Sequence, residues 1–209
     1  MYSNWELRAI ARKSLSGAWG MAVLVVLLYA IIATAIGSIP FFGGIVGILV
    51  AGPLIFGLCA YFLRTVRGER PDLPVMFSGF QQFGSTLVLY IVSSILIFLW
   101  TLLLIIPGII ASLRYSMAYF IMHDNPGISA LDAIRASKEM MHGYKGKLFL
   151  LMLSFIGWAI LCVITFGIGY LWLGPYVYTS LAAFYEDLRS RHQFTPGGMA
   201  DPYHPSAPM

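Results

Sequence analysis

Charge is scarce in this chain. Only 11% of its 209 residues are charged and 59% are hydrophobic, whereas soluble domains carry about 25% charged residues. A fold standing in water could not bury so much apolar surface, so the composition predicts an integral membrane protein. The 13 Lys and Arg exceed the 9 Asp and Glu only mildly. In a membrane chain such an excess is typical of topology signals and of contact with anionic headgroups, and we expect no nucleic-acid partner.

Reactive patterns are missing as well. The chain has no HExxH, GxSxG or GxxxxGKS/T motif, so the common signatures of zinc proteases, serine hydrolases and phosphate-binding loops are excluded. Cys59 and Cys162 fall in apolar runs without metal-ligand spacing, and we interpret them as small buried hydrophobes. We therefore predict a protein that is not an enzyme, with no metal site and no cofactor. Its four histidines are scattered over predicted loops and the tail, at His123, His142, His192 and His204.

Six apolar segments are long enough to cross a bilayer, because a helix rises about 1.5 Å per residue through a hydrocarbon core of roughly 30 Å. The first shows no clear cleavage site, so we expect a spanning helix rather than a signal peptide. The fourth is short, about fifteen residues from the turn at Pro107-Gly108 to a stop at residues 123–126. Away from their ends the segments contain no Asp, Glu, Lys or His, which disfavours proton-coupled transport. The segments are residues 17–39, 45–63, 84–106, 107–122, 148–166 and 170–185.

A short amphipathic helix is predicted before each pair of spans, lying on the membrane surface. Residues 3–16 open with Ser3 and Glu6, which form a capping-box pattern. Residues 73–83 and 129–142 are the second and third helices of this kind. In the first helix one apolar face is expected opposite Arg8 and Arg12, made of Trp5, Leu7, Ala11 and Leu15.

Six spans place both termini on one side of the membrane, and the charges decide which side. The basic residues of the loops all fall on the side of the termini, while the opposite loops carry none. The positive-inside rule therefore predicts that the N- and C-termini are cytoplasmic. Residues 1–191 form one transmembrane domain in this interpretation, and the Pro- and Gly-rich residues 192–209 form a disordered tail.

An internal repeat is also indicated. Three units of amphipathic helix plus helical hairpin are predicted at about residues 3–67, 72–124 and 129–189, packed around a common centre. Gly17, Gly79 and Gly143 stand at equivalent junctions between the amphipathic helix and the first span. The second span of each unit ends in a triplet of one alanine and two aromatic residues, at Ala60-Tyr61-Phe62, Ala118-Tyr119-Phe120 and Ala183-Phe184-Tyr185.

One permanent charge, Arg114, lies well inside an apolar segment. An arginine at such depth costs about 2.5–3.5 kcal/mol on insertion scales, so it needs a compensating interaction. The functional interpretation places its guanidinium in a polar cleft between hairpins, where the planar fork binds an anionic headgroup or substrate. The structural interpretation is snorkelling to an interface or pairing within the protein, and the sequence leaves both open. The candidate partners for pairing are helix-end carbonyls, Tyr115, Tyr178, Asp124 and Glu186.

A basic cluster follows in the third unit. Arg135 and Lys138 lie on the amphipathic helix, and Lys145 and Lys147 precede the fifth span. These side chains are candidates for binding anionic headgroups at the cytoplasmic face, although topology alone also requires positive charge there.

From Arg114 to Leu188 the chain resembles the bacterial membrane family called domain of unknown function 975. The stretches that carry the resemblance are RYSMAYFIMHDNPGISALDAIRASKEMMHGYKGKLFLLMLSFIGW and TFGIGYLWLGPYVYTSLAAFYEDL. The resemblance implies a six-helix protein of the bacterial inner membrane and brings no known activity or site residues. The junction at residues 137–143 is more distantly similar to one in the membrane domain of some glycerophosphodiester phosphodiesterases, which hints at lipid by analogy alone.

Two functions stay open at this point. The first is a membrane scaffold or lipid-interacting factor without enzymatic activity, whose partners are membrane lipids with anionic headgroups. The second is a transporter or channel for a small amphiphile, anionic lipid or peptide, with Arg114 in a membrane-embedded cleft. The sequence names no protein partner and sets no oligomeric state.

Overall fold

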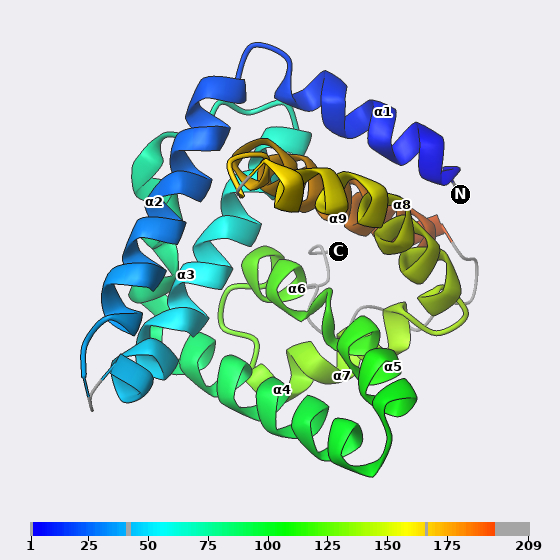
Figure 1. The fold of residues 1–209 in the computed structure, drawn as a ribbon. Helices are drawn as coiled ribbons and strands as arrows, with labels where there is room; N and C mark the ends of the chain where they lie inside the picture. Colours follow the sequence, from blue (N-terminus) through cyan, green and yellow to red (C-terminus); the bar gives the residue numbers. More distant parts are fainter. Residues whose placement is uncertain (1, 41–42, 166, 195–209) are drawn as a thin grey trace, which may run out of the picture.

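The computed structural model describes residues 2–40, 43–165 and 167–194, and every regular element in those ranges is a helix (Figure 1). The all-helical prediction is confirmed. The predicted tail lies outside the described residues except at its start, where the last helix continues to Phe194. In chain order the helices are α1 (Asn4–Leu15), α2 (Trp19–Gly37), α3 (Gly43–Val66), η1 (Leu73–Gln82), α4 (Phe83–Leu103), α5 (Ile105–Tyr115), α6 (Ala118–Asp124), α7 (Ala130–Met140), α8 (Lys145–Ile164) and α9 (Tyr170–Phe194).

Helix α1 begins as its sequence predicts. The Ser3 hydroxyl accepts the Glu6 N–H at 3.2 Å, and the Glu6 carboxylate accepts the Ser3 N–H, which closes the capping box. On α7 the Ser129 hydroxyl likewise accepts the Asp132 N–H, at 3.1 Å. Both segments are therefore helices with serine N-caps, and the cap predicted at Ser3 is confirmed.

The apolar face of α1 differs from the prediction at one residue. Leu7, Ala11 and Leu15 are fully buried, but Trp5 is 65% exposed. The assignment of Trp5 to this face is wrong, because Trp5 precedes Arg8 by three residues and so lies on the arginine side of the helix.

The η1 segment packs closely against α3. A side chain at Gly57 would overlap the Met76 carbonyl, and one at Gly79 would overlap the Pro53 carbonyl. Both glycines therefore allow the backbones of α3 and η1 to come into direct contact. Met76 itself is fully buried. This 3-10 helix leads directly into α4, so the second amphipathic segment packs along the middle of a span instead of standing apart from the spans.

The turn between the third and fourth spans lies three residues earlier than predicted. Leu104 has extended backbone angles between α4 and α5, whereas Pro107 and Gly108 lie inside the first turns of α5. Proline suits that position because the first N–H groups of a helix have no helical acceptor. Gly108 meets Thr101 of α4 so closely that a larger residue would overlap it.

The fourth span is longer than predicted and is broken. The segment from Ile105 to Asp124 covers 20 residues, and α5 gives way to α6 at Ser116 and Met117. The Ser137 hydroxyl of α7 satisfies two backbone groups at this break. It donates to the Arg114 carbonyl at 2.7 Å and accepts the Met117 N–H at 3.2 Å.

Five segments of the described chain are long and apolar enough to cross a membrane: Trp19–Gly37, Gly43–Val66, Leu73–Leu103, Ile105–Asp124 and Lys145–Ile164. Helix α9 has 25 residues but is not among them. Both cysteines are buried and free, as predicted. The five segments support a membrane protein, while the sixth span stays a prediction.

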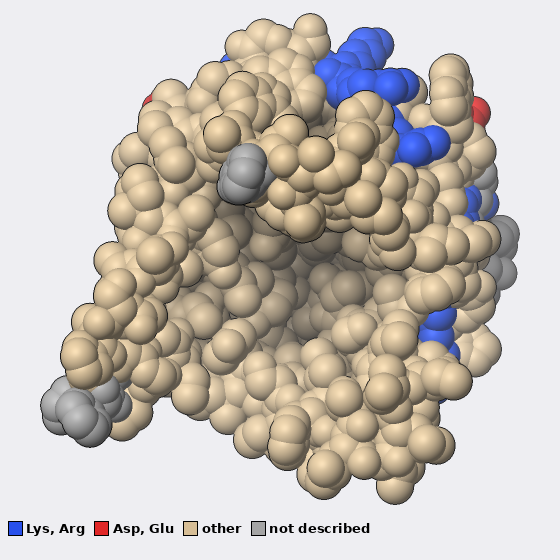
Figure 2. Space-filling model, viewed as in Figure 1, with Lys and Arg blue, Asp and Glu red and all other residues tan. Residues whose placement is uncertain are grey.

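The helices are not arranged as parallel hairpins. Figure 1 shows α8 and α9 running together across one end of the molecule, crosswise to α2 and α3, with α4 and α5 at the opposite end. Helix α1 packs along α9, and the Tyr2 N–H donates to Asp187 on α9 at 3.0 Å. Figure 2 shows basic side chains over α1 and an uncharged hollow in the surface below α8 and α9.

The predicted threefold repeat is not reproduced in every part. Gly17 and Gly143 both adopt positive φ angles at their junctions, whereas Gly79 lies within η1. The three aromatic triplets do meet in the core, where Phe120 and Tyr185 stack with ring centres 5.3 Å apart. The triplets thus share one core, while the three units and their common centre stay a prediction.

Candidate functional site

Arg114 lies in the last turn of α5 and has no compensating partner among the described residues. Its Nε atom is buried and makes no hydrogen bond, and no ion pair in the described ranges includes it. Of the candidate partners, Asp124 and Glu186 do not pair with Arg114, because both acids bind other arginines. A buried donor without an acceptor is costly, and an anionic ligand would supply that acceptor, so the functional interpretation of Arg114 stays open.

The other predicted site residues do not converge on Arg114. Arg135 is 76% exposed in its side chain and pairs with Asp132 at 3.4 Å. Lys138 is exposed on α7, whereas Lys147 donates to the Tyr2 carbonyl beside the start of α1. No hydrogen bond or ion pair joins any two of the five predicted residues where the chain is described, so they form a scattered basic surface and not a single site.

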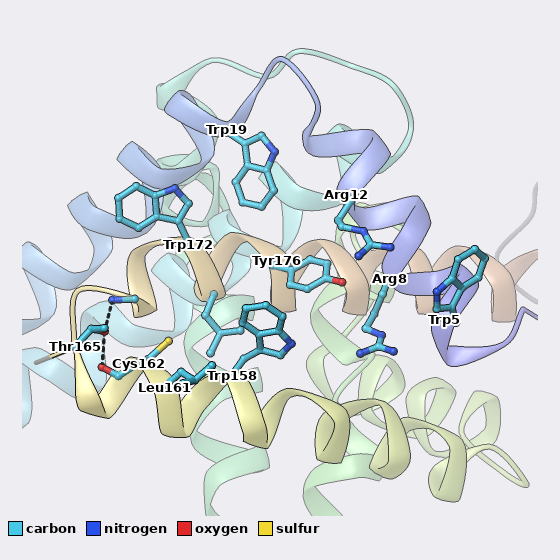
Figure 3. A pocket seen from close by; sticks show the side chains of 12 residues that line it. Trp5, Arg8, Arg12, Trp19, Trp158, Leu161, Cys162, Thr165, Trp172 and Tyr176 are labelled. Atoms are coloured by element: carbon cyan, nitrogen blue, oxygen red, sulfur yellow. Dashed lines mark hydrogen bonds between the residues drawn. The ribbon is translucent and has the colours of Figure 1, made fainter.

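A pocket of about 630 Å³ lies between α1 and the α8–α9 hairpin (Figure 3). Trp19 also lines it, so it lies at the end of the molecule where α2 begins. The charged loop after α3 lies at that end too, because Arg70 donates to the Ser16 carbonyl at 3.1 Å. The pocket is lined by Trp5, Arg8, Arg12, Trp19, Trp158, Leu161, Cys162, Thr165, Gly169, Trp172, Leu173 and Tyr176.

The two ends of this pocket differ in chemistry. Arg8 and Arg12 come from one face of α1, and Figure 3 shows both guanidinium groups beside Tyr176. The Arg8 Nε is buried and makes no hydrogen bond. At the other end, near the α8–α9 turn, the Thr165 hydroxyl is used within the chain, because it donates to the Cys162 carbonyl at 3.0 Å.

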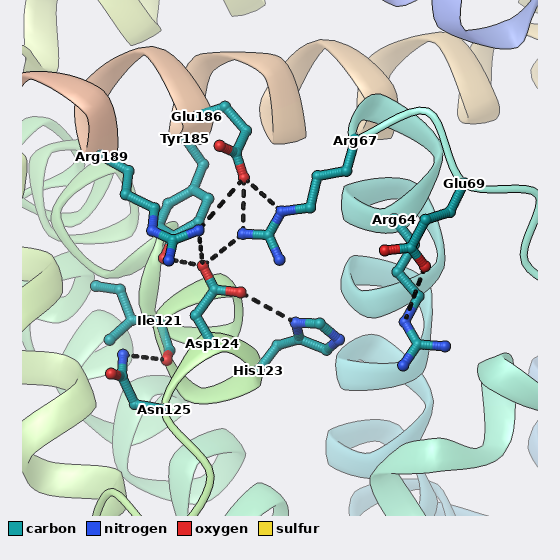
Figure 4. A network of polar contacts seen from close by, with 10 residues as sticks. All are labelled: Arg64, Arg67, Glu69, Ile121, His123, Asp124, Asn125, Tyr185, Glu186 and Arg189. Atoms are coloured by element: carbon teal, nitrogen blue, oxygen red, sulfur yellow. Dashed lines mark hydrogen bonds and ion pairs between the residues drawn. The ribbon is translucent and has the colours of Figure 1, made fainter. Parts of the chain in front are cut away.

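A second polar cluster pairs two arginines with two carboxylates. Asp124, whose side chain is 5% exposed, accepts hydrogen bonds from Arg67 at 2.6 Å and from the Tyr185 hydroxyl at 2.9 Å, and pairs with Arg189 at 3.1 Å (Figure 4). Glu186 accepts from Arg67 Nε at 2.8 Å. Two arginines thus face two carboxylates, which leaves no surplus charge for a ligand.

This cluster ties together the ends of three helices. Arg67 directly follows α3, Asp124 ends α6, and Arg189 belongs to α9. Each of the three helices contains one aromatic triplet, so the ion pairs join the same helices whose triplets meet in the core. We interpret the cluster as a structural clasp.

The chain matches the model of the family described as "Protein of unknown function (DUF975)" over residues 1–111 and 101–192. The chain belongs to this family. The match includes the N-terminal half, whereas the resemblance described above runs only from Arg114 to Leu188. No curated protein and no solved structure matches the chain. Since the family's own description assigns no function, it contributes no site residues, and the site has to be argued from this chain's geometry.

The pocket and the clasp were not among the predicted sites, although the sequence contains signals for both. Trp5, Arg8 and Arg12 are spaced by three and four residues, which places them on one helical face. Asp124, Glu186 and Arg67 all follow a second span of a predicted unit, at the same end of the molecule. Their mutual contacts could not be read from spacing, because they depend on how the three helices pack.

Proposed function

We propose that this family member is a polytopic protein of the bacterial inner membrane, without enzymatic activity, that acts as a scaffold or lipid-interacting factor. Its predicted form has six spans, with both termini in the cytoplasm and the basic helices α1 and α7 at the inner leaflet. The distant similarity to the membrane domain of some glycerophosphodiester phosphodiesterases agrees with a role at lipid, by analogy alone.

The observation that supports this proposal is uncompensated positive charge. Within the described ranges the buried carboxylate Asp124 and its neighbour Glu186 are occupied by Arg67 and Arg189. Most of the basic side chains of the described chain that have no ion pair lie on α1, on α7 and at the start of α8. These are Arg8, Arg12, Lys13, Lys138, Lys145 and Lys147, while Arg70 and Arg114 lie elsewhere.

Anionic lipid headgroups are the partners that such charge would meet at a cytoplasmic membrane surface. Each lysine or arginine near an anionic leaflet contributes about 1 kcal/mol of attraction. The same groups are next to exposed tryptophan and aliphatic side chains, including Trp5 and Leu131. That combination of apolar and basic side chains is typical of helices that lie at the lipid headgroups.

Native mass spectrometry of the full-length protein in nanodiscs of mixed anionic and zwitterionic lipid tests the proposal. We expect anionic lipid to be enriched on the protein, and Lys138→Gln or Lys145→Gln to lower its occupancy about fivefold each. Arg64→Gln serves as the matched control, because Arg64 already pairs with Glu69. Equal retention of anionic and zwitterionic lipid by the unaltered protein would contradict the proposal.

A transporter or channel is the second candidate, favoured by the unpaired buried Nε of Arg114. In that case Arg114 would bind an anionic amphiphile or peptide on its path through the membrane. Proteoliposome flux that is lost in Arg114→Met, while the variant keeps its melting temperature, would support transport. A variant that keeps full flux would exclude the role of Arg114.

A further inference from the structure

We propose that the pocket between α1 and the α8–α9 hairpin binds one single-chain amphiphile with a phosphate headgroup. The headgroup lies on Arg8 and Arg12, and the chain lies against Trp158 and Trp172. This inference rests on the proposed lipid-interacting function, but it assigns a discrete site with a defined ligand in place of a diffuse surface.

The size and walls of the pocket fit a ligand of this kind. Its volume of about 630 Å³ lies within the range of roughly 300–1,000 Å³ that is usual for small-molecule sites. Trp158 is 56% exposed and Trp172 is 54% exposed, so both present large apolar surface that no other part of the described chain covers. Leu161 on α8 and Leu173 on α9 add to this apolar lining.

The headgroup end is defined by two like charges. Arg8 and Arg12 are four residues apart on one helix, so they lie on the same face and repel each other. Neither has an ion pair among the residues that the structure describes, and the nearby Glu6 carboxylate is used by the Ser3 N–H. The buried Nε of Arg8 is a donor without an acceptor. Two oxygens of a phosphate can accept the two parallel N–H bonds of a planar guanidinium group.

The positive charge of Arg8 and Arg12 also distinguishes between an anionic headgroup and a quaternary ammonium headgroup. A group of tryptophans is typical of sites for quaternary ammonium groups such as choline. Here two uncompensated arginines line the same space, and they would repel a cation. An anionic headgroup is therefore favoured over a choline headgroup of the same chain length.

The position of the pocket agrees with a ligand that enters from the membrane. Trp19 and Arg12 lie at the end of the molecule that carries the charged loop after α3, whereas the aliphatic lining continues along α8. An amphiphile bound in this way keeps its headgroup among the basic groups of α1 and its chain beside the apolar surface of α8.

The test uses the full-length protein in uncharged detergent and an alkyl phosphate brominated near the end of its chain. Bromine near Trp158 and Trp172 quenches their fluorescence. We expect saturable quenching, with an apparent dissociation constant at least about tenfold lower than that of the chain-matched alkylphosphocholine. Equal affinity for the two headgroups would overturn the assignment. So would displacement by inorganic phosphate at the same concentration as the alkyl phosphate, because the chain would then contribute nothing.

Variants separate this pocket from general surface attraction. Arg8→Gln and Arg12→Gln should each weaken alkyl phosphate binding about tenfold, while Arg64→Gln, outside the pocket, should leave it unchanged. Should Arg8→Gln fail to fold, the exposed Arg12 still provides the test. If Lys138→Gln weakens binding and the two α1 variants do not, the pocket is wrong and the proposed lipid-interacting function stands. If anionic lipid is not enriched in nanodiscs, the proposed function fails independently.

Discussion

The nearly buried Asp124 carboxylate accepts hydrogen bonds from Arg67 and from the Tyr185 hydroxyl, and it forms an ion pair with Arg189. Asp124→Asn would leave two arginines without their shared counter-charge. Removing one member of a buried ion pair costs about 3–5 kcal/mol, so we expect a large loss of stability, measured as a fall in melting temperature in detergent.

The matched control for Asp124 is the exposed pair of Asp132 with Arg135. Arg135 is 76% exposed in its side chain, and exposed pairs contribute about 0–1 kcal/mol. Arg135→Gln should therefore barely change the melting temperature. A similar small effect for Asp124→Asn would mean that the clasp does not hold the three helices together.

Glu6 provides a dependence on pH. The Ser3 backbone N–H, and then the Ser3 hydroxyl, hydrogen-bond the Glu6 carboxylate and lower its pKa below the usual value of 4.5. A depressed folded-state pKa means that the carboxylate stabilises α1 above pH 4.5 and loses this effect as the pH falls through the lower folded value. We expect Glu6→Gln to melt lower than the unaltered protein at pH 7, and the difference to shrink at lower pH. A difference that stays constant from neutral to acid pH would contradict this account.

At the scale of whole helices, the contact of η1 with α3 makes a sharp prediction. A methyl group at Gly57 would overlap the Met76 carbonyl, which is backbone and cannot move aside cheaply. We expect Gly57→Ala to lower the free energy of unfolding by about 1–3 kcal/mol, measured by denaturation in mixed micelles. Gly157 on α8 has open space around it, so Gly157→Ala should be neutral or up to about 1 kcal/mol stabilising. Equal effects of the two changes would contradict the close packing.

Hydropathy and capping patterns predicted most helices to within a few residues. Ser3 with Glu6 placed the start of α1, and Ser129 placed the start of α7. The break at Leu104 was not predicted, because proline marks both a turn and the first turn of a helix, and its sequence does not distinguish them. In α1 the exposed position of Trp5 follows from helical spacing alone, because Trp5 is three residues before Arg8 and so shares its side of the helix.

The pocket and the clasp could not be predicted from the sequence, since each depends on contacts between distant segments. Arg67 and Asp124 are 57 residues apart in the chain, and apolar periodicity says nothing about which helix ends meet. Arg114 could be predicted as a candidate site because it lies deep in an apolar segment, which is a local property of the sequence. Arg8 and Arg12 stand before the first span, where positive charge is ordinary, so only the packing of α1 onto α9 shows that they line a pocket.

For the molecule as a whole, the side of the membrane on which the C-terminus lies depends on whether α9 crosses it. Six spans predict that both termini are cytoplasmic, whereas five would place Arg189 and Arg191 on the outer side, against the positive-inside rule. Reporter fusions decide between them. Fusions at Gly43 and Gly167 should report the outer compartment, and fusions at Lys145 and after the last residue should report the cytoplasm. If the C-terminal fusion reports with Gly167, α9 does not span and lies crosswise with α1. If the fusions at Gly167 and Lys145 report the same compartment, α8 does not cross the membrane. The prediction that α8 and α9 form a membrane-spanning hairpin is then wrong.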